Sequence, residues 1–264
     1  MIKKLAIASL LVSSILYADT VIGGEVSLGV YSHTPNGSAS YTLPYTSLNP
    51  SIDLENDFGW DTTQDFMLKA YFEHPLPFVP NVKIGYSTFN QSGSSTVSSF
   101  SWGGIIGLDG TVDTSLDLQM YDLTAYYELL DNVVELDAGL TLRYLGGDLT
   151  VTPTANFTLP GGIPDPSISA PQTTDIDIWL PLLYGKARFN IPSTDISLQL
   201  EGNGITYQDT TLYDYELSAR YTFTMGFAVE AGYKAMHLDS EDLAGGLVVY
   251  VDSTGPYASI VWDF

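Results

Sequence analysis

The feature that most limits the fold of this chain is an alternation of apolar and polar residues that runs to its last residue. In the final segment, 257–264, one face carries Ala258, Ile260, Trp262 and Phe264. The other face carries Tyr257, Ser259, Val261 and Asp263. Because a β-strand points successive side chains to opposite sides, we expect this segment to be a strand with one apolar face. Either a protein core or lipid must cover that face, and a strand in lipid must also be paired on both edges.

The same alternation predicts ten strands. They are expected at 21–31, 65–73, 82–89, 115–129, 133–144, 175–190, 195–207, 213–223, 229–235 and 257–264. Eight or twelve strands are the alternatives. The apolar phase slips twice: near Met120, where we expect a β-bulge, and at Pro181, where a bulge or an edge position would accommodate the proline.

The connections between these strands are sorted by length. Short turns are expected at 74–81, 130–132, 192–194 and 224–226. On the other side, the connections at 32–63, 90–113 and 146–174 are long and polar, a turn is expected at 208–210, and a further loop is expected at 238–246. Outer-membrane barrels have an even number of strands, short periplasmic turns and longer outside loops. A soluble two-sheet sandwich has no reason to sort its loops in this way. The sequence therefore predicts an all-β, transmembrane, antiparallel up-and-down β-barrel in the cell outer membrane.

The charged residues predict what fills this barrel. The chain has 9 Lys and Arg against 31 Asp and Glu, a formal net charge of −22. Beyond Lys3 and Lys4, every basic residue falls on the face opposite the apolar residues. A Lys or Arg facing lipid would cost ~2–4 kcal/mol at mid-bilayer. We therefore predict a lumen charge network of Glu25, Lys69, Glu73, Lys83, Glu135, Asp137, Arg143, Lys186, Arg188, Glu201, Glu216, Arg220, Glu230 and Lys234. In a soluble sandwich the same face would simply be solvated.

The first residues have the layout of a secretory signal peptide. Lys3 and Lys4 precede an apolar run at 5–17, which is too short for a spanning helix of ~20 residues. Ala18 supplies a small residue at the expected cleavage site. We expect residues 1–18 to be removed and the barrel to comprise residues 19–264; an N-terminal anchor helix is the alternative. The chain has no cysteine, which excludes disulfides and Cys-based metal or redox sites, and its negative charge argues against nucleic acid.

The three histidines are the main candidates for chemistry. His237 is expected near the outer end of its strand, beside Asp239, Ser240 and Glu241, so a Ser–His–acid site at the rim is one hypothesis. Such a site is defined by geometry and not by proximity in sequence. His33 is expected in a loop and His74 in a periplasmic turn. The acidic segments 53–61 and 239–242 offer oxygen ligands for Ca²⁺ but lack the EF-hand spacing, so solvated loops are the simpler interpretation.

Several segments also carry a family resemblance. They lie at 53–60, 72–83, 121–128, 201–204 and 213–216, and the most specific part is the His74-Pro75-Leu76-Pro77 turn. Together they resemble a family of small, largely uncharacterised outer-membrane β-barrel proteins of Gram-negative bacteria. The last strand is similar to the barrel-assembly signal of such proteins, with Ala258, Ile260, Trp262 and Phe264 in the recognised positions. The resemblance implies fold and location but no reaction, so it implies no catalytic residue, cofactor or metal.

These observations favour a non-enzymatic structural or surface barrel. Its expected partners are outer-membrane lipid and lipopolysaccharide, and the barrel-assembly machinery. We expect the lumen to be closed, because eight strands leave room only for side chains and ten strands lie close to that limit. A narrow channel or carrier for a small solute, and a rim hydrolase acting on lipid or peptide, are the alternatives.

Overall fold

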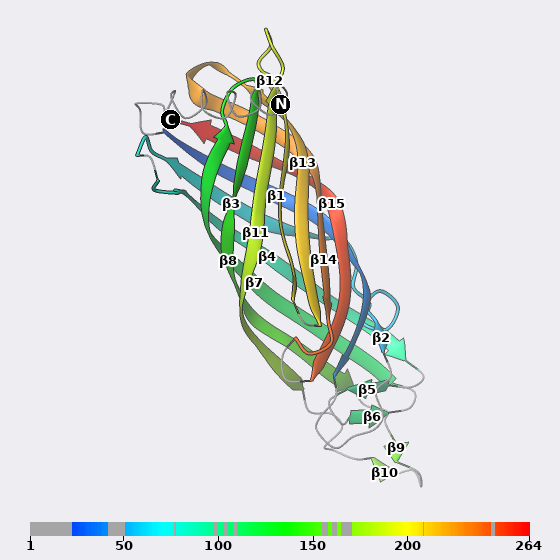
Figure 1. The fold of residues 1–264 in the computed structure, drawn as a ribbon. Helices are drawn as coiled ribbons and strands as arrows, with labels where there is room; N and C mark the ends of the chain where they lie inside the picture. Colours follow the sequence, from blue (N-terminus) through cyan, green and yellow to red (C-terminus); the bar gives the residue numbers. More distant parts are fainter. Residues whose placement is uncertain are drawn as a thin grey trace, which may run out of the picture.

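The computed structural model describes residues 23–41, 51–76, 78–97, 100–102, 105–107, 110–154, 158–159, 163–164, 171–207, 209–243 and 246–264. Within them, ten long strands form one antiparallel sheet that closes on itself, because the last strand pairs with the first (Figure 1). These strands are β1 (Gly23–Tyr41), β3 (Thr63–Glu73), β4 (Asn81–Val97), β7 (Gly110–Leu130), β8 (Val134–Thr154), β11 (Gln172–Asn190), β12 (Ile196–Tyr207), β13 (Thr210–Thr222), β14 (Phe227–Ser240) and β15 (Leu247–Asp263). The predicted fold class is confirmed. The expected signal peptide at 1–18 lies outside the described residues.

The two ends of the barrel differ. At one end the chain makes short turns, one of them through a 3₁₀ turn, η2 (Thr224–Gly226), and β1 begins there where β15 ends. We name this the inner end. The opposite, outer end carries the short strands β2 (Ile52–Asp53), β5 (Phe100–Trp102), β6 (Ile105–Gly107), β9 (Thr158–Leu159) and β10 (Ile163–Pro164) (Figure 1). In the described part of the chain, no helix has the length and apolar character needed to cross a membrane.

Several strands extend further toward the outer end than the sequence predicted. β1 continues to Tyr41, which pairs with Leu247 at the start of β15, and β4 and β7 remain paired as far as Val97 and Gly110. The predicted loops at 32–63, 90–113, 146–174 and 238–246 are therefore partly wrong. These extensions are rich in Gly, Ser, Thr and Asp, and they lack the regular outward apolar residues by which the membrane part of each strand was recognised.

The predicted β-bulge at Met120 is wrong. β7 passes through Met120 in continuous register with both neighbours, and its irregularity lies between Glu128 and Leu130. Instead, the surroundings of the strand change. Toward the outer end Leu118 and Met120 point into the barrel and are buried, whereas toward the inner end Leu123 points outward and is 54% exposed. Where the strand crosses the membrane, its apolar residues face outward to lipid. Where the strand extends into water, its apolar residues face inward to an internal core. The phase slip near Met120 therefore marks the level at which β7 leaves the membrane and enters water.

Pro181 occupies an edge position without a bulge. It pairs with Leu142 of β8 in an unbroken register. Among the described residues, β12 pairs with β11 only from Leu183↔Gly204 toward the inner end. Pro181 has no N–H to donate. It lies just beyond Leu183, the last residue of β11 that pairs with β12.

The outer wall of the inner half is an apolar belt. Leu140, Leu183 and Ile260 are each more than 60% exposed, and many Val, Phe and Tyr residues beside them are about half exposed. Patches of this extent are covered by another molecule in nature. Outward aromatics lie in this wall, among them Trp262 and a contacting pair, Tyr144 and Trp179, with ring centroids 4.8 Å apart. A closed barrel with such a belt is built to span a membrane, with lipid around the belt.

Candidate functional site: the barrel lumen

The interior of the inner half is filled by charged side chains. All fourteen residues of the predicted network lie on the inward side of their strands, and each of the seven Lys and Arg beyond residue 18 makes an ion pair there. The strand alternation explains the placement, because apolar residues that face lipid leave every second position for the lumen. The functional role of the network stays a prediction. Its contacts form three groups.

The first group lies near the inner end. Arg220 donates to both carboxylate oxygens of Glu25 at 2.8 Å and to Glu230 at 2.9 Å. Arg188 joins the same Glu25 at 2.9 Å and lies 3.4 Å from Glu135. Two guanidinium groups on β11 and β13 thus share one carboxylate on β1, so this group ties distant strands across the lumen.

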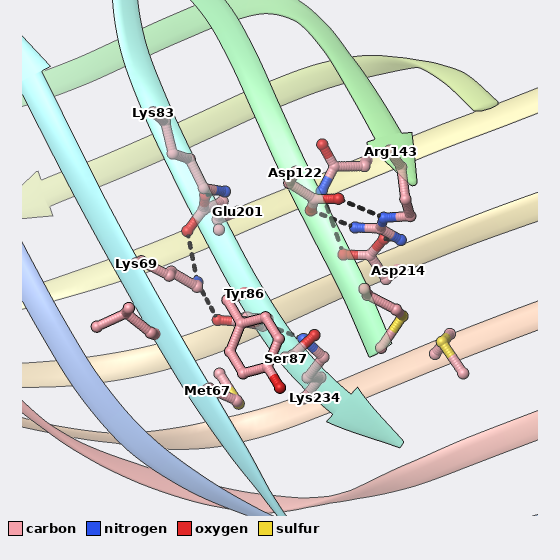
Figure 2. Close-up of a pocket in the computed structure, with 17 residues that line it drawn as sticks. Met67, Lys69, Lys83, Tyr86, Ser87, Asp122, Arg143, Glu201, Asp214 and Lys234 are labelled. Carbon is pink, nitrogen blue, oxygen red and sulfur yellow. Dashed lines mark hydrogen bonds and ion pairs between the residues drawn. The ribbon is translucent and has the colours of Figure 1, made fainter. Parts of the chain in front are cut away.

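The second group lies at mid-barrel, and Figure 2 shows it beside a pocket. Glu201 accepts hydrogen bonds from Lys83 and, at 2.9 Å, from Lys69. Lys69 also donates to Glu216 at 2.5 Å, and Glu216 accepts from Lys234 at 2.9 Å. Three ammonium groups therefore alternate with two carboxylates across the lumen. All five side chains are buried or nearly so, which makes each charge dependent on its partners.

The third group contains two residues that the predicted network lacked. Arg143 donates to both carboxylate oxygens of Asp122 at 2.7 Å and to Asp214 at 2.6 Å (Figure 2). Both aspartates lie on strand faces that the sequence assigned to the lumen, so the alternation could have predicted them as members of the network. The cavity between these groups is about 30 Å³, which is room for roughly one or two water molecules.

A vestibule opens at the inner end. It has a volume of about 490 Å³ and is lined by carboxylates together with two cations, among them Glu25, Glu73, Glu128, Glu135, Lys186 and Arg188. Lys186 lies 3.3 Å from Asp137, and Glu73 accepts a hydrogen bond from Tyr126 at 3.1 Å. The vestibule therefore ends against the ion-paired groups above it.

The interior of the outer half is an apolar core. It contains buried residues from most of the long strands, including Phe89, Leu118, Leu149, Ile176, Leu212 and Val249. The segment 52–60, expected to be part of a polar loop, joins this core with Leu54, Phe58 and Trp60 fully or almost fully buried. The Trp60 indole donates to Thr114 at 2.9 Å, and the Thr114 hydroxyl donates to the Phe58 carbonyl at 3.1 Å. This segment closes the lumen a second time, above the ion pairs.

His33 lies in β1 and not in a loop as predicted. Its Nε2 is 2.7 Å from Asp65 and its Nδ1 is 2.9 Å from the Ser253 hydroxyl, so the three residues have the connectivity of a Ser–His–Asp triad. Ser253 and His33 have no exposed surface, so neither side chain is open to solvent. Asp65 also accepts from the Asn90 amide at 2.9 Å, beyond the last β3–β4 pair, Met67↔Ser87. The cluster therefore joins β15, β1, β3 and β4 at the level where the pairing between β3 and β4 ends.

The other histidines make local contacts. His237 pairs with Asp252 at 2.7 Å, and its ring stacks on Tyr213 with centroids 4.8 Å apart. In the described part of the chain its partner is thus a residue on β15, and not the Asp239 and Ser240 that neighbour it in sequence. His74 lies within 3.2 Å of the Pro80 carbonyl in the turn after β3. No cluster of three or more His, Asp or Glu suited to a metal occurs among the described residues, and the Asp53 carboxylate instead accepts from backbone amides of its own turn.

The last strand has the orientation expected of an assembly signal. Its four predicted recognition residues, Ala258, Ile260, Trp262 and Phe264, all point outward. Phe264 and Gly24 exchange two backbone hydrogen bonds of 2.8 and 2.9 Å, and the Phe264 ring lies so close to Gly24 that a Cβ there would come within 2.6 Å of it. The terminal residue thus completes the closure between β1 and β15.

Comparison with known proteins supports the fold. No family model matches the sequence, and no curated protein matches it. Among solved structures, the outer membrane protease OmpT from Escherichia coli is similar with a TM-score of 0.57 at 12% identity, over 92% of this chain and 96% of that chain. The translocator domain of the autotransporter NalP from Neisseria meningitidis has a TM-score of 0.43 at 14% identity, over 98% and 95% of the two chains. At 12% identity the likeness to OmpT concerns architecture alone.

Proposed function

We propose that this protein is a non-enzymatic outer-membrane barrel that is closed to solutes and acts through its surface. The observation that carries the proposal is the double closure of the lumen. Ion pairs fill the inner half, and an apolar core with the inward segment 52–60 fills the outer half. The space left between them holds about 30 Å³.

The sequence resemblance supports the same proposal. The turn that begins at His74 and the other matching segments are similar to small, largely uncharacterised outer-membrane barrels, for which the resemblance implies a location and no reaction. We propose membership of that group. Outer-membrane lipid and lipopolysaccharide then surround the apolar belt, and the barrel-assembly machinery recognises the last strand through Ile260, Trp262 and Phe264.

Conductance across planar bilayers tests the closure. The wild-type protein should give no steady large current. The triple variant Arg143→Ala, Arg220→Ala, Trp60→Ala removes bulk from both closures and should leak, whereas Arg143→Ala with Arg220→Ala leaves the apolar core of the outer half in place and should stay silent. As a matched control, Leu142→Ala with Ile260→Ala removes side chains from the lipid-facing wall and should stay silent. A wild-type protein that conducts like a general porin would overturn the proposal.

A narrow channel or carrier is the second candidate function, and the vestibule favours it. A cavity of about 490 Å³ at the inner end could admit a small cationic solute as far as the ion pairs. Passage would then require the ion-paired network to separate and the apolar core of the outer half to open. Small, brief conductance steps in the wild type, lost when the vestibule is neutralised by Glu73→Gln with Glu135→Gln, would favour this function over the closed barrel.

The non-enzymatic part of the proposal has its own test. The hydrolase-like geometry lies at Ser253 and His33, inside the barrel and not at the rim beside His237, and both residues are enclosed. A fluorophosphonate probe should leave the folded protein unlabelled. Labelling that disappears in both Ser253→Ala and His33→Ala would show an accessible nucleophile and refute the proposal.

A further inference from the structure

Among the described residues, one strand edge at the outer end has no partner strand. β4, β7, β8 and β11 form a four-stranded panel that is paired continuously from the membrane outward, for example at Asn90↔Asp117, Asp117↔Asp148 and Asp148↔Asp175. On the far side of β11, pairing with β12 stops at Leu183↔Gly204. The described residues therefore leave β11 unpaired on that side from 172 to 182.

The opposite edge of the same panel is protected. Beyond Ser87, the outer part of β4 has no β3 partner, but Asp65 accepts from the Asn90 amide there at 2.9 Å. Further out, Ser95 donates to the Asp57 carbonyl of the inward segment. The chain thus covers one edge with its own residues, whereas no described residue plays this part along β11. Open edges are usually blocked because they pair with other chains.

The proline in β11 shows which backbone groups are free. Amides of successive residues in a strand point to opposite sides. Pro181 lacks an N–H, yet the ladder to β8 is unbroken around it, so its nitrogen points to the open side. The residues at the same parity are Thr173, Asp175, Asp177 and Trp179, and their N–H and C=O groups therefore also point to the open side.

The side chains beside this edge define the complementary sequence. Asp175 and Asp177 point to the outer surface, next to Asp117 and Asp148 in directly opposed positions. All seven Lys and Arg beyond residue 18 are held in lumen ion pairs, so no Lys or Arg in the described part of the chain compensates these carboxylates on the outer surface. On the inward face, Ile178 and Leu180 are only partly buried against the core. An added strand needs basic residues outside and apolar residues inside.

We propose that the open edge of β11 binds an extended polypeptide segment in which basic and apolar residues alternate, by strand addition. This inference deepens the proposed surface function and rests on it. Main-chain hydrogen bonds would supply affinity, and the alternation would supply specificity. A second copy of this chain does not fit, because an antiparallel pairing of two β11 edges would bring the acidic rows together, and opposed like charges are destabilising.

Peptide binding to the full-length protein in lipid nanodiscs tests the proposal. The probe is a fluorescent peptide of about eight residues, the length of an ordinary strand, that alternates Val with Lys. Its controls are a peptide of the same composition with Val and Lys in separate blocks, and a peptide that alternates Val with Glu. Fluorescence anisotropy should show saturable binding of the first, with both controls weaker by about tenfold or more.

Two substitutions at one position separate the backbone from the charge. Asp177→Asn removes the carboxylate and keeps the edge amide, whereas Asp177→Pro removes both and leaves the ladder to β8 intact. Binding should weaken about twofold to threefold in the first and at least about tenfold in the second. An unchanged heat-shift on gels shows that both variants remain folded.

Equal affinity of the two variants, or equal binding of the alternating and block peptides, would overturn strand addition and leave only electrostatic attraction. No binding of any peptide would overturn the proposal outright. The closed-barrel function is judged separately, because conductance does not depend on the peptide: a silent barrel that binds nothing refutes this inference alone, and a conducting barrel refutes the closure.

Discussion

The lumen network makes a quantitative prediction at Arg143. This guanidinium holds Asp122 through two bonds of 2.7 Å and Asp214 through one of 2.6 Å, and all three side chains are largely buried. Arg143→Met keeps much of the side-chain volume and removes the charge. It leaves two buried carboxylates without their cation, for which a loss of about 3–5 kcal/mol in the free energy of unfolding is expected.

Neutralising the partners as well should recover most of that loss. In the triple variant Arg143→Met, Asp122→Asn, Asp214→Asn, no buried charge is left unpaired, and replacing a whole buried ion pair is often close to neutral. The triple variant should therefore be more stable than Arg143→Met alone, although it carries more substitutions. The double variant Asp122→Asn, Asp214→Asn leaves Arg143 unpaired and should resemble the single variant.

Equilibrium urea unfolding in lipid vesicles, followed by tryptophan fluorescence and by the heat-shift on gels, measures these differences. The four proteins form a thermodynamic cycle whose coupling energy isolates the interaction between the arginine and the aspartates. The reasoning is refuted if Arg143→Met costs less than about 0.5 kcal/mol, the usual range of a surface substitution, or if the effects of the single and double variants simply add.

Three further outcomes are expected. Deleting Phe264 should lower the amount of barrel in the outer membrane far more than Tyr257→Ala does, because Phe264 faces lipid at the closure while Tyr257 faces the lumen; equal amounts on heat-shift gels would argue against an assembly signal in the last strand. Mass spectrometry of the mature protein should find Asp19 as its first residue, and an intact Met1 would refute the signal peptide. His33→Ala should lower the free energy of unfolding by about 1–3 kcal/mol, since Asp65 loses a buried hydrogen bond, and a variant as stable as the wild type in urea would show that the cluster does not hold the strands together.

The sequence predicted the number of strands and the inward face of each strand because both depend on local alternation. A residue such as Lys69 is assigned to the lumen by its immediate neighbours, which face lipid. The sequence did not predict which charged residues pair with each other inside the lumen. Arg220 meets Glu25 across a sequence separation of 195 residues, and that meeting depends on the closure of the barrel and on the registers of all its strands. No local pattern contains this information.

The cluster around His33 was missed for a related reason. Its segment has no regular apolar alternation, so it was expected to be a loop, and a loop residue has no defined face. Once β1 extends through it in register with β3, His33 points inward and comes beside Asp65 of β3 and Ser253 of β15. These contacts form because β1 extends through His33. The sequence did not predict this extension because its composition is polar and lacks apolar alternation.

The phase slip at Met120, which was interpreted as a bulge, indicates the boundary of the membrane. The sequence of one strand alone cannot distinguish these two interpretations. A bulge disturbs one strand and leaves its neighbours in phase. A change from lipid to water must instead reverse the apolar face of adjacent strands at the same level. Met120 pairs with Leu145, both inward and apolar, and the next inward pair toward the inner end is Asp122 with Arg143. The interior changes from apolar to charged between these two pairs on both strands at once. A slip shared by directly opposed positions therefore marks the boundary of the membrane, and this rule separates the two interpretations once strand pairing is known.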